Sequence, residues 1–244
     1  MVTVTIDNKM IQVPENTTIL EAARMAKIEI PTLCYLKDIN EIGACRICAV
    51  EIVGNVRLVP ACENLVQDGM VVYTNSPKVR SARRTNLRLI LSQHDARCAL
   101  CVRSGNCTLQ KLANDHNLVY TPYETKLRRK SWGYNAPLIR DENKCIKCMR
   151  CVQVCDRIQD MHIWDIAGTG SRTTIDVSRN RHITETECTY CGQCITHCPT
   201  AGLVERDDTS PVFDALKDPD RITVVQIAPA VRAAWAEAFN LSPQ

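Results

Sequence analysis

Cysteine thiols are the residues of this chain whose spacing most clearly indicates chemistry. Eight of the fifteen cysteines stand in two runs with the same spacing, two gaps of two residues and then a gap of three. A disulfide framework needs side chains that face one another, which three sulfurs along one short loop do not offer. A zinc site usually pairs two short knuckles around four ligands, so zinc also fits the spacing poorly. The runs are Cys145, Cys148, Cys151 and Cys155, and then Cys188, Cys191, Cys194 and Cys198.

The doubled run resembles that of the bacterial two-cluster ferredoxins. In that family each run holds three corners of one 4Fe-4S cluster and lends its fourth cysteine to the other cluster. The resemblance implies one cluster on Cys145, Cys148, Cys151 and Cys198, and a second on Cys155, Cys188, Cys191 and Cys194. We refer to these as the first and second cysteine sets.

Two features depart from a small ferredoxin. Pro199 follows the second run as expected, but Asp156 follows the first. In addition, 32 residues separate Cys155 from Cys188, far more than a minimal ferredoxin uses. Within them, residues 163–166 and 173–177, on either side of a G-T-G turn, predict a small inserted hairpin.

Length and composition place the chain among ordinary globular proteins. Its 244 residues are 45% hydrophobic, which suffices for one to two domains. No apolar run approaches the length of a membrane span, and the first residues lack the charged start and apolar core of a signal peptide. We therefore expect a reducing cytoplasm, where thiolates bind metal rather than pair.

The charge balance argues against nucleic acid as a partner. Thirty Lys and Arg against 27 Asp and Glu leave a formal charge of only +3. The local basic runs at residues 80–84 and 126–130 are interpreted as solvated faces or as counter-charges to anionic clusters. A nucleic-acid surface would place aromatic residues among them, and aromatics make up only 5% of the chain.

The first 27 residues predict two strands and a helix. Residues 2–6 alternate, residues 7–9 turn, and residues 10–13 return as the second strand of a hairpin. Thr18 and Glu21 form a capping-box pattern before an alanine-rich stretch, which predicts a helix to about residue 27. A ubiquitin-like β-grasp fold begins with this order of elements.

Four further cysteines follow this beginning, with a first gap of ten residues. Plant-type ferredoxins hold a 2Fe-2S cluster with a first gap of four. The longer gap is similar to that of the large iron-sulfur subunit of respiratory complex I and of iron-only hydrogenases, down to P-T-L-C-Y at 31–35 and G-A-C-R-I-C at 43–48. Together with the strand predicted at 49–53, the resemblance implies a 2Fe-2S cluster rather than a zinc finger. Its ligands would be Cys34, Cys45, Cys48 and Cys62.

A histidine precedes the last three cysteines, at the end of a second predicted helix. Ser76 and Pro77 supply the N-cap and first position of that helix, with Val79, Leu87, Ile90 and Leu91 recurring on one face. Taken alone, three cysteines and one histidine fit zinc well. In the complex I and hydrogenase family this pattern, in this place, marks a 4Fe-4S cluster with one histidine ligand. The resemblance thus implies a cluster on His94, Cys98, Cys101 and Cys107.

A histidine ligand is expected to change the reduction potential of its cluster. A neutral ring in place of a thiolate makes a cluster less negative, so the cluster on His94 is expected at a higher potential than the others. The remaining histidines are interpreted as ordinary surface or core residues; they are His116, His162, His182 and His197.

The end of the sequence changes in character. Residues 221–228 predict a buried strand, and residues 229–239 predict a helix. The phrase Q-I-A-P-A-V-R at 226–232 resembles the opening of the catalytic domain of iron-only hydrogenases. The cysteine motifs that bind the catalytic cluster in that family do not occur in this sequence, so we expect no active site of its own.

These patterns predict an α+β chain in four parts. They are a β-grasp 2Fe-2S ferredoxin domain at 1–76, a helical 4Fe-4S domain with one histidine and three cysteine ligands at 77–120, a two-cluster 4Fe-4S ferredoxin domain at 138–206, and a truncated hydrogenase-like strand-helix tail at 207–244. Residues between 120 and 138 are interpreted as a surface connector. One 2Fe-2S and three 4Fe-4S clusters account for all fifteen cysteines and about 14 irons.

The expected function is electron transfer. The sequence has no Gly-rich nucleotide loop and no nucleophile motif. The resemblance implies as partners a flavin-containing NAD(P)H-oxidising subunit, a small 2Fe-2S subunit, a hydrogenase or formate dehydrogenase catalytic subunit, and ferredoxin in a bifurcating complex. Two alternatives stay open. One is the amino-terminal part of a catalytic enzyme whose active-site domain lies beyond Gln244, and the other is a zinc-stabilised scaffold.

Overall fold

The computed structural model of the chain describes residues 1–124, 127 and 131–242. It separates into two compact units, residues 1–206 and residues 207–244. Apart from Leu127, the basic run at 126–130 lies outside the described residues.

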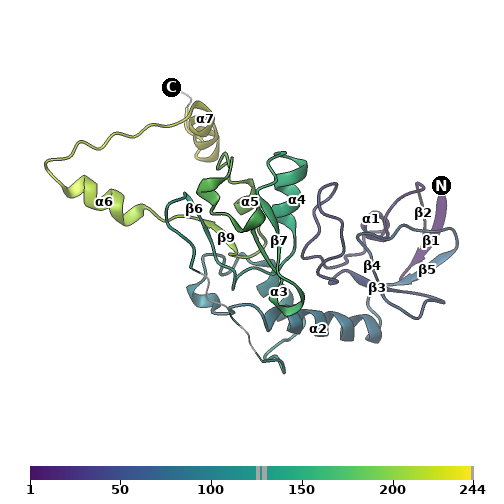
Figure 1. Ribbon diagram of the computed structural model, residues 1–244. Coiled ribbons are helices and arrows are strands. Elements are labelled where there is room, and N and C mark those ends of the chain that lie inside the picture. Colours follow the sequence, from purple (N-terminus) through teal and green to yellow (C-terminus); the bar gives the residue numbers. More distant parts are fainter. Residues whose placement is uncertain (125–126, 128–130, 243–244) are drawn as a thin grey trace. The chain divides into compact units, whose positions relative to one another are not determined.

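A five-stranded sheet forms the amino-terminal part of unit 1 (Figure 1). The predicted hairpin is present as β1 (Val2–Ile6) and β2 (Lys9–Val13). Strand β5 (Met70–Tyr73) pairs parallel with β1 and antiparallel with β3 (Ala49–Ile52), and β4 (Val59–Pro60) closes the far edge. The resulting strand order is β2-β1-β5-β3-β4, and the loop that carries Cys34, Cys45 and Cys48 leads into β3.

Helix α1 (Ile19–Met25) covers this sheet with an apolar face. The Thr18 side chain accepts a hydrogen bond from the backbone of Glu21 at 3.2 Å, as the capping pattern predicts. Lys27 adopts a left-handed φ of 58°, which ends the helix near the predicted position.

Helix α2 (Pro77–Leu91) connects the sheet to the histidine-cysteine region. Ser76 is its N-cap, as predicted, and accepts from the backbone of Val79 at 3.3 Å. A 3₁₀ turn, η1 (Cys98–Leu100), and helix α3 (Thr108–Asp115) follow. Leu87 on α2 packs with apolar residues of α3 in one core cluster.

Within the basic run at 80–84, the solvated-face interpretation is wrong for Arg83, whereas Arg80 is exposed. Only 4% of Arg83 is exposed. Its guanidinium donates to the carbonyl oxygens of Ile47 at 2.9 Å, Ala49 at 2.9 Å and Thr74 at 2.8 Å. Arg83 lies one helical turn after the buried Val79, so the charge points into the fold, where three carbonyls surround it.

The two-cluster part of unit 1 has a short central ribbon and two short helices. Strand β6 (Leu138–Arg140) pairs antiparallel with β9 (Leu203–Glu205). Helix α4 (Arg150–Arg157) packs against α5 (Gln193–Thr196). This packing brings together two stretches that are more than thirty residues apart in the sequence.

The inserted hairpin is confirmed between α4 and α5. Strands β7 (Trp164–Ala167) and β8 (Thr174–Val177) pair antiparallel around the 3₁₀ turn η2 (Gly170–Arg172). Gly168 is needed in this turn, because it has a φ of +73° and a side-chain carbon there would lie 2.5 Å from the Arg172 carbonyl oxygen. Two further 3₁₀ turns, η3 (Ser178–Asn180) and η4 (Ile183–Glu185), return the chain toward the second run.

The described part of unit 2, residues 207–242, contains two helices, α6 (Thr209–Lys217) and α7 (Pro229–Ala238). The helix predicted at 229–239 is therefore present, but the strand predicted at 221–228 is wrong, since these residues are exposed and have no regular structure. A strand needs a neighbouring strand to pair its backbone, and the described part of unit 2 offers none. None of the helices in the described ranges is both long and apolar enough to cross a membrane.

Replacing Arg83 with leucine is expected to destabilise unit 1 by about 3 kcal/mol, because three buried carbonyl oxygens lose a charged donor. Urea unfolding at constant m-value measures the effect. Arg80→Leu is the matched control on the same helix, since Arg80 is exposed and donates only to the Asn75 carbonyl. Equal stability losses in the two variants would show that the buried contacts of Arg83 contribute nothing.

Candidate metal centres

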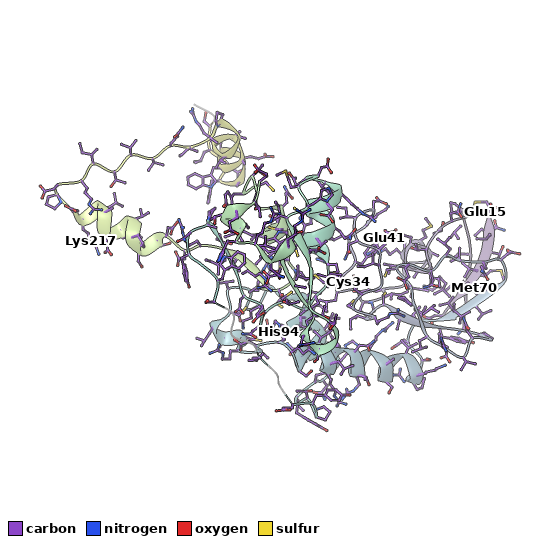
Figure 2. All side chains as sticks on the ribbon, in the orientation of Figure 1. Glu15, Cys34, Glu41, Met70, His94 and Lys217 are labelled. Carbon is purple, nitrogen blue, oxygen red and sulfur yellow. The ribbon has the colours of Figure 1, made fainter. Side chains whose placement is uncertain are left out.

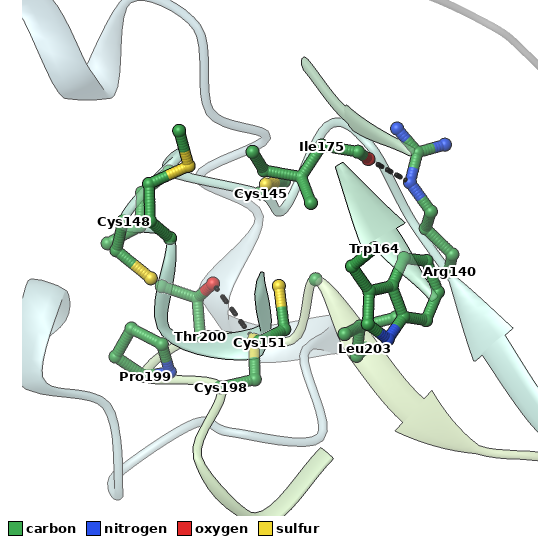
Figure 3. Close-up of a pocket in the computed structure, with 13 residues that line it drawn as sticks. Arg140, Cys145, Cys148, Cys151, Trp164, Ile175, Cys198, Pro199, Thr200 and Leu203 are labelled. Atoms are coloured by element: carbon green, nitrogen blue, oxygen red, sulfur yellow. Dashed lines mark hydrogen bonds between the residues drawn. The ribbon is translucent and has the colours of Figure 1, made fainter. Parts of the chain in front are cut away.

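The first cysteine set lines a single pocket (Figure 3). Three of its thiols come from the loop that leads into α4 and from the start of that helix, and Cys198 comes from the turn after α5. The other walls are largely apolar and include Trp164, Ile175 and Leu203. The structure thus brings Cys198 to the other run's thiols, as the two-cluster resemblance implies.

The second cysteine set lines a second pocket, with Met161 and Ile163 in its wall. Cys155 comes from the last part of α4, and its three companions come from the loop before α5 and from α5 itself. The fourth cysteine of each run therefore lies with the first three of the other run. All eight thiols are free, with no disulfide among them.

The two loops share one backbone conformation. Lys147 and Tyr190, each two residues after the first cysteine of its run, have φ values of 57° and 52°. Met149 and Gly192, two residues further on, have φ values of 65° and 75°. Left-handed residues of this kind turn successive N–H groups to one side of the loop, which suits an anionic ligand. The backbone of Lys147 accordingly donates to the sulfur of Cys145 at 3.4 Å.

Burial favours the protonated form of Cys148 and Cys194 in the metal-free protein. It raises the pKa of Cys148 to about 12 and that of Cys194 to about 11. A buried thiolate therefore needs a positive charge beside it, and a bound metal supplies one while displacing the proton. Four soft sulfur donors in a largely apolar pocket fit an iron-sulfur cluster by ligand type.

The four thiols of the β-grasp part lie as two pairs. Cys34 donates to Cys45, and this bond, together with backbone N–H groups, lowers the pKa of Cys45 to about 6. Cys62 similarly lowers the pKa of Cys48. Left-handed φ values of 59° at Gly43 and 56° at Arg46 shape the loop around them. Donors of the type that a 2Fe-2S cluster requires are therefore gathered here.

His94 is only 7% exposed, and its Nδ1 has no hydrogen-bond partner. Burial and the neighbouring charge of Lys144 lower the pKa of His94 to about 4, so the ring is neutral near pH 7. A neutral, buried ring with an unpartnered nitrogen has the form that metal ligation needs.

The three cysteines that follow His94 are gathered less completely. They are half-buried, and His94 lines a different pocket, with Asp95, Arg97 and Tyr120 but without a cysteine. Among the described residues, no three His, Cys, Asp or Glu side chains are arranged to hold a single metal ion. The other histidines have ordinary partners; His116, for example, lies 3.0 Å from the Leu112 carbonyl through its Nδ1.

Two side chains join the first cysteine set to the loop of the β-grasp part that carries Cys34, which is labelled in Figure 2. Asn40 is buried and donates from Nδ2 to the carbonyl oxygens of Cys34 at 2.7 Å and Cys148 at 2.9 Å. Arg150 donates to the carbonyls of Cys34 at 3.1 Å and Tyr35 at 2.9 Å. Sequence reasoning missed both residues, because neither is one of the spaced cysteines and each bridges to a segment more than 100 positions away.

The histidine-cysteine region contacts the same set from another direction. The buried Lys144 donates to the Asp95 carbonyl at 2.6 Å and lies 3.5 Å from its carboxylate. Arg103 donates to the carbonyl of Cys198 at 2.9 Å. The first cysteine set is therefore in direct hydrogen-bond contact with both preceding regions of unit 1.

Comparison with known families matches three successive parts of the chain. Residues 1–77 match a 2Fe-2S iron-sulfur cluster binding domain, residues 83–120 match the NADH-ubiquinone oxidoreductase-G iron-sulfur binding region, and residues 144–201 match a 4Fe-4S dicluster domain. The chain is an iron-sulfur electron-transfer region. The resemblances to complex I and to iron-only hydrogenases are thereby confirmed.

Individual proteins similar to this chain include hydrogenases and their subunits. The NADP-reducing hydrogenase subunit HndD of Solidesulfovibrio fructosivorans is 41% identical over 100% of the chain, and iron hydrogenase 1 of Clostridium pasteurianum is 34% identical over 99%. The chain spans only 43% and 42% of the length of these two relatives. A solved NAD⁺-reducing [NiFe]-hydrogenase chain superposes with a TM-score of 0.76 at 28% identity, covering 84% of this chain and 87% of that one.

The crossing of the fourth cysteines makes a specific prediction. Cys155→Ser is expected to convert or lose the 4Fe-4S cluster of the second set and to spare that of the first, because Cys155 lines only the second pocket. Cys198→Ser, its matched counterpart, is expected to do the reverse. Iron analysis and electron paramagnetic resonance (EPR) spectroscopy of the reduced proteins distinguish the two. Loss of the first cluster alone in Cys155→Ser would contradict the crossing.

Proposed function

We propose that the chain binds one 2Fe-2S and three 4Fe-4S clusters and relays electrons between a flavin-containing NAD(P)H-oxidising partner and a hydrogenase or ferredoxin. The observation that carries this proposal is the gathering of eight free thiols into two pockets, four in each. The cluster ligands would be Cys34, Cys45, Cys48 and Cys62; His94, Cys98, Cys101 and Cys107; Cys145, Cys148, Cys151 and Cys198; and Cys155, Cys188, Cys191 and Cys194.

The residues of the chain have four tasks in such a relay. When bound, iron-sulfur clusters take up and release single electrons, and the protein sets their potentials through ligands, burial and hydrogen bonds to sulfur. The thiolates bind the iron, and backbone groups such as the Lys147 N–H stabilise sulfur charge. Asn40 and Arg150 hold two ligand loops in one orientation. Apolar side chains such as Trp164 and Leu203 keep water from the first set.

The proposed partners follow from the relatives and not from this chain's own surface. The relative from Solidesulfovibrio is named as a subunit of an NADP-reducing hydrogenase, and the superposed structure is that of an NAD⁺-reducing hydrogenase. A flavin-containing subunit, a small 2Fe-2S subunit and a hydrogenase or formate dehydrogenase subunit in a reducing cytoplasm are the partners that we propose.

A second candidate function is supported by the extent of the alignments. Both named relatives match residues of unit 2 as well as unit 1, and both are more than twice as long as this chain. The region would then be the amino-terminal part of a catalytic iron-only hydrogenase or a formate dehydrogenase-type enzyme. Reading the gene beyond codon 244 decides between the candidates, since further cysteine motifs favour the catalytic enzyme and a stop codon favours the separate subunit.

His94→Ala is expected to remove or convert one 4Fe-4S cluster, which lowers the iron content by up to about four of about 14 atoms. The EPR signal of the reduced 2Fe-2S cluster is expected to persist, since His94 lies outside the β-grasp part. His116→Ala is the control, because His116 is half-buried on the same region and bonded to a backbone carbonyl. Unchanged iron and unchanged spectra in His94→Ala would speak against ligation, and colourless protein loaded with zinc would overturn the proposal as a whole.

Isolation of the tagged chain from its native host tests the partners. Co-purification of a flavoprotein and a hydrogenase, with NAD(P)H-dependent reduction of the iron-sulfur signals, is the expected result. A complex that contains neither protein would rule out this assignment of the relay.

A further inference from the structure

The side-chain amide of Asn40 lies between two cysteines that belong to different sets. Its Nδ2 donates to the carbonyl oxygen of Cys34 at 2.7 Å and to that of Cys148 at 2.9 Å. Cys34 is one of the proposed 2Fe-2S ligands, and Cys148 lines the pocket of the first set (Figure 3). A single nitrogen atom is therefore in contact with the backbones of proposed ligands to two different clusters.

Asn40 is fixed in this position by its own backbone and by complete burial. None of its surface is exposed. Its N–H donates to the Leu36 carbonyl at 2.8 Å, and its carbonyl accepts from the Leu36 N–H at 3.1 Å. Only the amide nitrogen can donate to carbonyl oxygens, so the Asn40 Oδ1 is turned away from them. This oxygen is buried without a hydrogen-bond partner among the described residues, an arrangement that the fold accepts where the donor group is needed.

The two hydrogen bonds of Asn40 complete a bonded path from sulfur to sulfur. In each cysteine the carbonyl carbon is joined to Sγ through Cα and Cβ, and the Asn40 nitrogen joins the two carbonyl oxygens. Electrons tunnel more readily along bonded and hydrogen-bonded atoms than across contacts between packed side chains. Arg150 also donates to the Cys34 carbonyl, at 3.1 Å. Its guanidinium reaches Cys148 only through its long side chain and the backbone, so that path is much longer.

The histidine-cysteine region meets the 2Fe-2S ligands in a different way. Cys45 of the 2Fe-2S ligands and Cys107 of that region both pack against one apolar core cluster. The buried members of this cluster are Leu33, Ile47, Leu87, Leu109 and Leu112. Contacts between apolar side chains are van der Waals contacts, which transmit electrons less well than hydrogen bonds. The polar bridge of Asn40 thus leads from the 2Fe-2S ligands to the first set.

We propose that the amide of Asn40 is the group through which the 2Fe-2S cluster and the first 4Fe-4S cluster exchange electrons. This inference rests on the proposed function, since it requires both clusters. One electron leaves the reduced cluster and enters the oxidised one, while the amide keeps its protons and is itself neither oxidised nor reduced. Asn40 touches the ligand residues and not the iron, so it is a positioning residue whose hydrogen bonds set the rate of transfer.

Asn40→Leu keeps the approximate shape of the side chain and removes the donor. Pulse radiolysis of the purified full chain delivers single electrons, and visible absorbance then follows how fast they distribute between the two cluster types. The rate constant is expected to fall about tenfold, which is about 1.4 kcal/mol of activation free energy. Redox titration and dipolar EPR are expected to give wild-type potentials and a wild-type separation of the two clusters, because the lost bonds end on carbonyls and not on sulfur.

Asn86→Leu is the matched control. Asn86 donates from its side-chain amide to the Arg46 carbonyl at 3.1 Å, in the same ligand loop, but it reaches that loop from α2. Its rate constant is expected to equal that of the wild type. An equal fall in both variants would show that any loosening of the loop slows transfer, and an unchanged rate in Asn40→Leu would show that the amide carries no electrons. A slower rate with a larger cluster separation would show that Asn40 is only a spacer. Each of these results overturns the inference.

A second variant serves if Asn40→Leu assembles no clusters. Asn40→Ser adds no volume, and its single O–H bonds only one of the two carbonyls at a time, so the path is again interrupted and the same fall in rate is expected. A wild-type rate in Asn40→Ser with both cluster signals intact refutes the inference alone. Absence of the 2Fe-2S or the four-iron signals from the wild-type chain refutes the proposed function instead.

Discussion

Backbone carbonyls around the cysteine loops need hydrogen-bond donors, and this need decides how unit 1 packs. A loop that turns N–H groups toward sulfur leaves carbonyl oxygens facing the rest of the protein. Asn40 meets two such oxygens, and Arg83 meets that of Ile47 together with those of Ala49 and Thr74 beside the loop. A buried oxygen left without a donor would cost about 1–3 kcal/mol. The ligand loops are therefore fixed in the fold by polar side chains as much as by apolar contact.

Hydrogen-bond donors of this kind connect the first cysteine set to the other cysteine-bearing regions of unit 1. Asn40 reaches it from the β-grasp loop, and Arg150 on α4 reaches from it to the same loop. Lys144 and Arg103 join it to the histidine-cysteine region. Trp164 joins it to the second set. A relay of single electrons requires that neighbouring sites keep a fixed separation, and hydrogen-bonded networks of this kind rigidify a structure. The contacts give this set the position of a junction between the other three.

How much the sequence could predict depended on the range of each interaction. The gap lengths of the cysteine runs constrain short loops directly, and the structure groups the eight thiols in two pockets. The apolar pattern within residues 163–177 is also a local signal, and the predicted hairpin is present. Arg83 was misread from its charge, although it occupies the apolar helical stripe between Val79 and Leu87, which is the signal that could have found it. Asn40 and Trp164 carry no such signal, because their partners come from distant segments. The strand at 221–228 failed because apolar composition cannot supply a pairing partner.

Three side chains in the cysteine loops are kept at positions where the backbone is left-handed. Their presence shows that the contacts of these side chains matter more for the site than the strain of the backbone conformation. Lys147, Met149 and Tyr190 each adopt a conformation that costs a non-glycine residue about 1–3 kcal/mol, and only Gly192 among the four equivalent positions avoids it. Met149 and Tyr190 line the two pockets, and Lys147 is hydrogen-bonded to Gln93. Glycine at these positions would relieve the strain but open the pockets to water. The free energy of metal binding adds to the free energy of folding. A bound cluster would therefore offset the backbone strain, which the metal-free thiols cannot do.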